Sequence, residues 1–175
     1  MLNWSVRQPK IYIKLPSQGN FWPEGSLEKT LTGEYPVYSM STADEITTRI
    51  PDGLVNGIAT VKIIESCIPN IKNAWDTPSM DLYLILVAIR IATYGEKMTL
   101  PLDTKDADVE FEVDLRNILS NLASTIKWEP LVPINDVVVH VKPISYRHFN
   151  KEAIETFESQ KSVQIVEKMD MSDEE

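Results

Sequence analysis

Residues 77–95 read TPSMDLYLILVAIRIATYG, and this stretch decides the fold. Eight consecutive residues, Leu82–Ile89, are apolar or aromatic. A helix that crosses a membrane needs about 20 such residues, so this run is too short to span a bilayer. Its flanks are typical of a soluble helix, with Thr77 as N-cap, Pro78 at the first helical position and Gly95 just past the end. Because the run is apolar on nearly every side, it predicts a central helix covered by other elements all round.

A second apolar stretch, VNGIATVKIIESCIPN (55–70), precedes the central helix and contains the single cysteine. Its three- and four-residue spacing predicts a helix that Pro69 ends. Cys67 falls at the edge of the buried face and near the helix C-terminus, where the helix dipole disfavours a thiolate. The pattern therefore favours a packed, inert cysteine over a catalytic nucleophile.

The remaining chain predicts an α+β domain rich in helices. Residues 11–15 alternate like a half-buried strand, and residues 16–25 form a loop rich in Pro and Gly that presents Phe21 and Trp22. Residues 33–40 are extended, and Ser41 caps a short helix to about Arg49. Beyond Gly95 the pattern predicts a β-hairpin turning at Lys105, a helix from 115, a β-branched strand over 136–143 and a long amphipathic helix to 168. A single domain over 1–168 is expected, followed by a disordered acidic tail at 169–175.

The second strand of the predicted hairpin has the sharpest local pattern. Apolar residues from Val109 to Leu115 alternate with the four carboxylates Asp108, Glu110, Glu112 and Asp114. The apolar side is expected to pack on the core. The acidic side is either a solvated sheet face, a docking face for a basic partner or a cation site. Alternate strand residues run parallel about 7 Å apart, a poor arrangement for binding a cation.

Composition and charge narrow the class of function. The chain has 175 residues and a net charge of −9, most of it in residues 101–175, so binding to a nucleic acid backbone is not expected. One cysteine suits a reducing compartment, and the first ten residues lack the pattern of a secretory signal. Phosphate-binding, hydrolase and zinc motifs are absent, and His140 and His148 lack the spacing of zinc ligands. We therefore expect no cofactor, no metal, no catalytic residue, no small-molecule substrate and no membrane insertion.

Several stretches in order resemble one known family. They are IKLPSQGNFWPEGSL (13–27), TGEYPVYSMSTADE (32–45), PDGLVNG (51–57), ESCIPNIKNAW (65–75) and PSMDLYLILVAIRIATYGE (78–96). Together they resemble the baseplate hub proteins of T-even-type contractile-tailed bacteriophages, which include hub assembly proteins and a hub distal subunit. Members of that family often carry a CxxC zinc hairpin after the last of these stretches. The corresponding region of this chain has no cysteine, so no metal site is carried over.

The resemblance implies a structural or assembly protein of the tail baseplate hub that binds other hub proteins. It would act in the host cytoplasm during assembly or in the tail baseplate of the virion. Aromatic side chains are favoured anchors of such interfaces. The candidate partner-binding residues, taken as exposed, are Phe21, Trp22, Tyr35, Tyr38, Trp75, Asp108, Glu110 and Glu112. The alternative is a hub-associated hydrolase acting on γ-glutamyl substrates through Cys67, or through a histidine and carboxylates.

Overall fold

The computed structural model describes residues 7–50, 53, 56–104, 107–125 and 129–172. For residues 102–104, 107–109 and 162–172 it describes the backbone only. The predicted helix break at Pro51 and Asp52 and the predicted turn at Lys105 lie outside this part. In chain order the elements are β1 (Ile11–Lys14), β2 (Glu34–Val37), α1 (Thr42–Thr48), α3 (Ile58–Cys67), η1 (Ala74–Asp76), α4 (Ser79–Tyr94), β3 (Lys97–Thr104), β4 (Ala107–Asp114), α5 (Leu115–Thr125), β5 (Leu131–Ile134), β6 (Val137–His140) and α6 (Tyr146–Ser172). Helices combine with separate antiparallel strand pairs, which confirms the α+β class.

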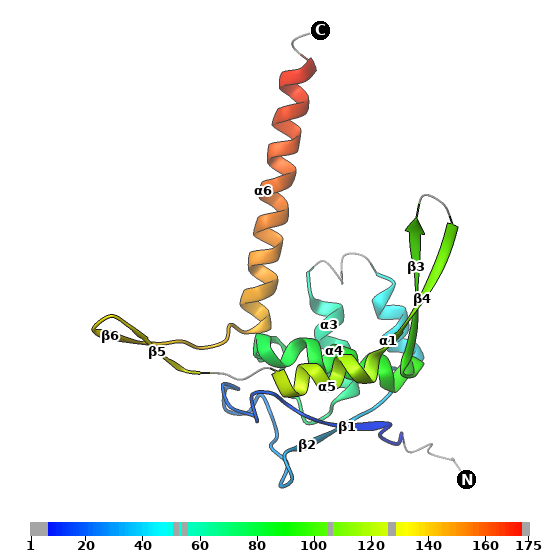
Figure 1. Ribbon diagram of the computed structural model, residues 1–175, viewed down its shortest axis with the longest axis vertical. Helices are drawn as coiled ribbons and strands as arrows, with labels where there is room; N and C mark the ends of the chain where they lie inside the picture. Colours follow the sequence, from blue (N-terminus) through cyan, green and yellow to red (C-terminus); the bar gives the residue numbers. More distant parts are fainter. Residues whose placement is uncertain (1–6, 51–52, 54–55, 105–106, 126–128, 173–175) are drawn as a thin grey trace.

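Helix α4 lies in the middle of a packed body, against α3, α5 and the β1–β2 pair (Figure 1). Most of its apolar side chains are buried, as predicted, and Ile85 and Ala88 are completely inaccessible to solvent. One strip of the helix remains open, where Tyr83 is 56% and Tyr94 is 54% exposed. The prediction of all-round burial is therefore wrong for this strip.

The start of α4 differs by one residue from the prediction. Pro78 is the N-cap, in an extended conformation, and the helix begins at Ser79. Pro78 forms a β-bridge with Ser145, and the Ser79 backbone N–H donates to the Ile144 carbonyl at 2.8 Å. This long-range pairing holds Pro78 extended and delays the first helical turn.

Local signals place the smaller elements correctly. Helix α3 ends at Cys67, two residues before Pro69, and Cys67 is buried. Helix α1 has the predicted N-cap at Ser41, with a reciprocal capping box to Asp44. Strands β1 and β2 pair antiparallel, with Ile13 opposite Tyr35, and both side chains enter the core.

Two hairpins and one helix project from this body (Figure 1). The β3–β4 and β5–β6 hairpins each form their own two-stranded sheet, and α6 extends away from the body over 27 residues. Helix α6 continues to Ser172, so residues 169–172 of the expected disordered tail are helical, and 173–175 lie outside the described part. No helix among the described residues is long and apolar enough to cross a membrane.

Candidate protein-interaction surface

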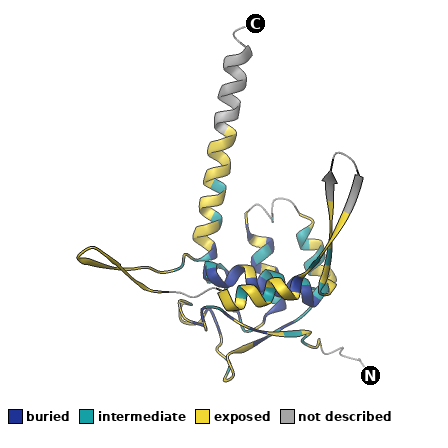
Figure 2. Ribbon diagram, viewed as in Figure 1, coloured by how far each residue is buried: buried dark blue, intermediate teal, exposed yellow. Residues whose placement is uncertain are grey.

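Among the side chains that the structure describes, the β5–β6 hairpin carries the largest group of exposed apolar ones on a projecting element, and Figure 2 shows this hairpin exposed along most of its length. Residues paired across the two strands share a face of the hairpin. The register pairs Leu131 with His140, Val132 with Val139, Pro133 with Val138 and Ile134 with Val137. One face therefore carries Val132, Ile134, Val137 and Val139, and the other carries Leu131, Pro133, Val138 and His140.

Neither face of this hairpin is covered by the body. Val137 and Val138 point to opposite faces, and each is 63% exposed. Leu131 and Ile134 are 59% and 54% exposed. A two-stranded hairpin alone is marginally stable in water, and contiguous exposed apolar surface is typical of a contact site. The hairpin is therefore the strongest candidate for a protein-binding element.

A shallow apolar groove continues this surface onto α6. It has a volume of about 380 Å³ and is lined by Ile144, Phe149, Glu152, Ala153, Thr156, Phe157 and Gln160. Phe157 is 59% and Ile144 is 49% exposed. Because Ile144 connects the hairpin to α6, the two apolar surfaces meet at the base of the helix.

Aromatic and polar contacts fix the base of α6 to the body. The rings of Trp75 and Tyr146 stack with centroids 5.6 Å apart, and the Arg147 guanidinium lies 5.4 Å from the Trp75 ring centroid. The Asn150 side-chain amide donates to the Asn56 carbonyl at 3.0 Å. Gly57 has a φ of +76°, and a Cβ there would lie 2.9 Å from the Asn150 side chain, so glycine is required at this close approach.

This arrangement corrects the expected placement of Trp75. The residue was expected to be an exposed contact for a partner, but it is half-buried and its ring is used within the chain. Trp75 lies in η1, and its ring partners Tyr146 and Arg147 lie about 70 residues later, in α6. The resulting contact holds α6 in place, and with it the apolar groove.

The loop that carries Phe21 and Trp22 is attached to the start of α4 by a buried carboxylate. Asp81 accepts hydrogen bonds from the Ser17 backbone N–H at 2.8 Å, the Ser17 hydroxyl at 2.5 Å and the Trp22 indole N–H at 2.9 Å. Burial raises the pKa of Asp81, although these hydrogen bonds favour the ionised form. Trp22 is half-buried against the core, so its expected role as a free contact residue is corrected, whereas Phe21 is 36% exposed.

The two tyrosines are less accessible than expected. Tyr35 is 3% exposed, and burial followed by the nearby Asp81 charge raises the pKa of its hydroxyl. It is a core residue, because the β1–β2 register places it beside Ile13 on the inner face. Tyr38 is half-buried, with the Arg7 guanidinium 5.8 Å from its ring centroid. The expectation that Tyr35 is exposed is therefore wrong.

The β3–β4 hairpin has one acidic and one apolar face. Glu110 and Glu112 are exposed on β4, and the Lys97 ammonium lies 2.8 Å from a Glu112 carboxylate oxygen. The backbone of Asp108 lies in β4, but its side chain is outside the described part. On the other face Phe111 is 55% and Leu100 is 38% exposed. The expectation that this face packs on the core is wrong for these residues, since the hairpin extends beyond the body (Figure 2).

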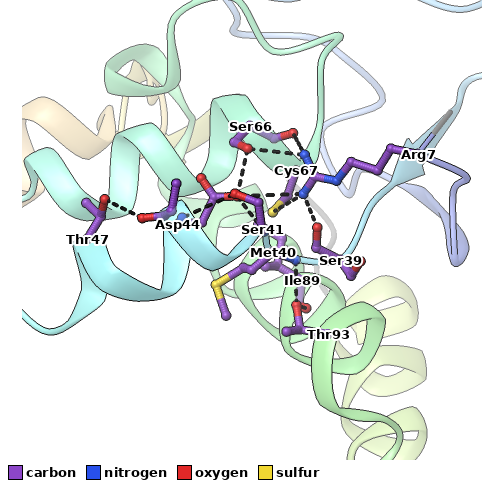
Figure 3. Close-up of polar contacts among 11 residues, drawn as sticks. Arg7, Ser39, Met40, Ser41, Asp44, Thr47, Ser66, Cys67, Ile89 and Thr93 are labelled. Atoms are coloured by element: carbon purple, nitrogen blue, oxygen red, sulfur yellow. Dashed lines mark hydrogen bonds and ion pairs between the residues drawn. The ribbon is translucent and has the colours of Figure 1, made fainter. Parts of the chain in front are cut away.

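Buried Cys67 lies at the inner side of a partly exposed polar cluster with Arg7 and Asp44 (Figure 3). The Arg7 guanidinium donates to the Ser39 carbonyl, to the Ser66 carbonyl at 3.0 Å and toward the Cys67 Sγ at 3.7 Å. Burial, partly offset by the Arg7 charge, raises the pKa of the Cys67 thiol to about 11. A thiol with this pKa is protonated at neutral pH, so burial keeps Cys67 unreactive despite the neighbouring Arg7 charge.

Asp44 is the acceptor at the centre of the same cluster. Burial alone would raise its pKa, but hydrogen bonds from Ser41 and Ser66 and the Arg7 charge outweigh burial and lower it. The cluster thereby joins the N-terminal segment, the start of α1 and the end of α3, which is a structural role.

The histidines lie on the projecting parts rather than near the thiol. His140 is exposed on β6, and the His148 Nδ1 is 2.9 Å from the Ser145 hydroxyl. Within the described part of the chain, no group of three or more His, Cys, Asp or Glu side chains could hold a metal ion.

Comparison with known proteins adds no relative to this description: no family model, curated protein or solved structure matches the chain.

The sequence did not identify the β5–β6 hairpin as a candidate contact site. Only a strand over 136–143 was expected, and β5 was not identified. The available signal was the two-residue turn Asn135–Asp136 between the apolar runs LVPI and VVVH, since Asn135 adopts the positive φ of 53° that such turns require.

Proposed function

We propose that this protein is a structural or assembly component that works through protein–protein contacts, in the setting of a contractile phage tail baseplate hub. The observation that carries the contact role is the β5–β6 hairpin, which exposes apolar side chains on both of its faces. The hub setting rests on the sequence resemblance of residues 11–116 to T-even-type hub proteins. The proposed partners are other hub proteins of the same phage.

The separation between a packed body and projecting apolar elements supports this proposal. The body has its own buried core, and α6 is fixed to it by the stacked pair Trp75 and Tyr146. The hairpin and the α6 groove then present apolar surface on a firm base, which reduces the entropy lost on binding. The Cys67 route to the alternative γ-glutamyl hydrolase is disfavoured, because that thiol is buried and protonated at neutral pH.

The first experiment tests whether the protein is associated with the tail baseplate hub. Mass spectrometry of purified tails and of baseplate intermediates from the phage that encodes this chain should detect it bound to hub proteins. Its absence from the virion, together with failure to co-purify with any hub protein from infected cells, would refute the baseplate role.

The second experiment tests whether the β5–β6 hairpin and the α6 groove form the partner-binding surface. Ile134→Ser and Phe157→Ser should each weaken hub-protein capture at least tenfold, because contact-site anchors contribute about 1–4 kcal/mol. Leu31→Ser is the matched control, since Leu31 is fully exposed on the β1–β2 loop, away from the hairpin. Thermal unfolding should be nearly unchanged in all three variants. Equal capture by all three would show that partners bind elsewhere.

A further inference from the structure

The two edges of the β5–β6 hairpin differ in their capacity to bind another strand. The Val141 backbone N–H donates to the Pro130 carbonyl at 2.8 Å, which makes this pair a hydrogen-bonded one. Bonded and non-bonded pairs alternate in an antiparallel ladder, so the Leu131–His140 and Pro133–Val138 pairs are non-bonded. The backbone N–H and C=O groups of Val138 and His140 therefore point away from β5, toward the open edge.

The opposite edge of the hairpin is blocked. Pro133 occupies the outward-pointing position on β5, directly across from Val138, and it has no N–H to donate. Proline at such a position is a common protection against strand addition. Strand β6 lacks this protection between Val137 and His140, so it is the edge at which an added strand can form a ladder.

We propose that β6 pairs antiparallel with β6 of a second copy of this chain, in a register centred on Val139. In this register the unpaired backbone N–H and C=O groups of the two copies meet. Val138 of one copy lies opposite His140 of the other, and each such pair exchanges two backbone hydrogen bonds. It places Val139 against Val139 and Val137 against Val141 on the apolar face. The segment DVVVHVK (136–142) is thus complementary to itself.

Charge complementarity supports the second copy as the occupant. In the same register Asp136 of each copy comes level with Lys142 of the other, so opposite charges meet at both ends of the paired strands. Both side chains are exposed. A different register would lose this match, and a one-residue shift would move the valines to the other face.

The pairing is expected to be weak by itself. Stable interfaces bury about 1,200–2,000 Å² in total, and two four-residue strands bury less than this. We expect a reversible dimer with a dissociation constant in the micromolar range, about 10–100 µM, seen as a concentration-dependent mass in sedimentation. The inference concerns a second copy of this chain and does not depend on the proposed baseplate role.

Engineered cysteines test the register directly. Val139→Cys places two thiols in a non-bonded cross-strand pair with Cα atoms about 4.5 Å apart, which permits a disulfide. Val137→Cys, on the same apolar face, leaves its thiols about 13 Å apart along the strands. Under mild oxidation Val139→Cys should form a covalent dimer and Val137→Cys should not. Equal cross-linking of the two variants would overturn the register, and Cys67 does not interfere because it is buried.

Charge reversal tests the same register without a new cysteine. Lys142→Asp and Asp136→Lys each set like charges together at both ends, and each should weaken the dimer about tenfold, or about 1.4 kcal/mol. An equimolar mixture of the two variants restores opposite charges at both ends and should dimerise as well as the original chain. A monomer at all concentrations up to about 200 µM would overturn the proposal and leave the edge to a different partner. A dimer insensitive to both reversals, or retained in Val138→Pro, would assign self-association to another surface.

Discussion

Replacing Asp81 with alanine should be among the most destabilising single changes in this chain. Asp81 is completely buried, and its two oxygens accept three hydrogen bonds that hold the 16–25 loop against the start of α4. The substitution removes the acceptor for the Ser17 backbone N–H, the Ser17 hydroxyl and the Trp22 indole. Ser17 is itself 3% exposed, so solvent cannot replace the lost partner without opening the loop.

The expected cost follows from these three donors. A buried polar group left without a partner costs about 1–3 kcal/mol, and two of the three donors belong to the buried Ser17. The Trp22 indole is half-buried and can recover part of its hydrogen bonding from water. Removing the desolvated carboxylate offsets part of the loss. We expect a net cost of about 3 kcal/mol, a large share of the 5–15 kcal/mol typical of a domain.

Urea unfolding followed by circular dichroism measures this cost by linear extrapolation. Trp22→Phe is the matched variant, because it removes one donor and keeps an aromatic ring, and it should cost about 1 kcal/mol. In the double variant the costs should not add, since both changes remove the same hydrogen bond. A cost below about 1 kcal/mol for Asp81→Ala, or strict additivity, would refute the view that this network holds the loop.

The remaining predictions concern pH, the base of α6 and the thiol. Burial raises the Asp81 pKa above its ordinary 3.8, so the folded chain keeps a proton that the unfolded chain loses. Binding of this proton contributes fully to the free energy of unfolding below about pH 3.8, and the contribution is lost as pH rises through the raised pKa. Denaturation at successive pH values should show that Asp81→Asn reduces this decline in the free energy of unfolding. An unchanged dependence of the unfolding free energy on pH would contradict the prediction. Trp75→Ala removes the stacking partner of Tyr146 and should cost about 3 kcal/mol, with faster hydrogen exchange in the first turns of α6, whereas Trp75→Phe should retain most protection. Equal exchange in both variants would show that α6 is held by other contacts. Cys67, with a pKa of about 11 against 9.0 for an unperturbed thiol, should react with a disulfide reagent at least a hundredfold more slowly in the folded than in the unfolded chain, and comparable rates would contradict its burial.

The elements that the sequence predicted well are those defined by local chemistry. The capping box of Ser41 and Asp44 marks α1, and Pro69 requires α3 to end before it. The length and apolarity of 79–94 identify the central helix. One boundary was missed because its cause is distant: Pro78 is held extended by Ser145, 67 positions away, and no local pattern reports such a pairing.

The candidate contact residues were predicted less well, since exposure depends on tertiary packing. Tyr35 and Trp22 have the residue types of interface anchors, but one faces the core and the other donates to Asp81. Conversely, the alternation of β4 correctly separated acidic from apolar residues without revealing that Phe111 is 55% exposed. The valines of β6 resemble a buried strand in sequence, and only their position on a projecting hairpin shows that they are exposed.

An exposed apolar hairpin can promote aggregation, and the structure of this hairpin limits where another strand can be added. Pro133 blocks one edge, and the other edge is short and is bounded by the turn at Asp136 and by Pro143. Strand addition is thereby confined to a few residues of β6, which favours a defined, weak contact over open-ended aggregation. Because the body folds around its own core, side chains on the hairpin contribute little to folding. Their identity can therefore be determined by the partner that they bind. Substitutions there should therefore change association while leaving the unfolding free energy nearly constant, the reverse of what is expected at Asp81.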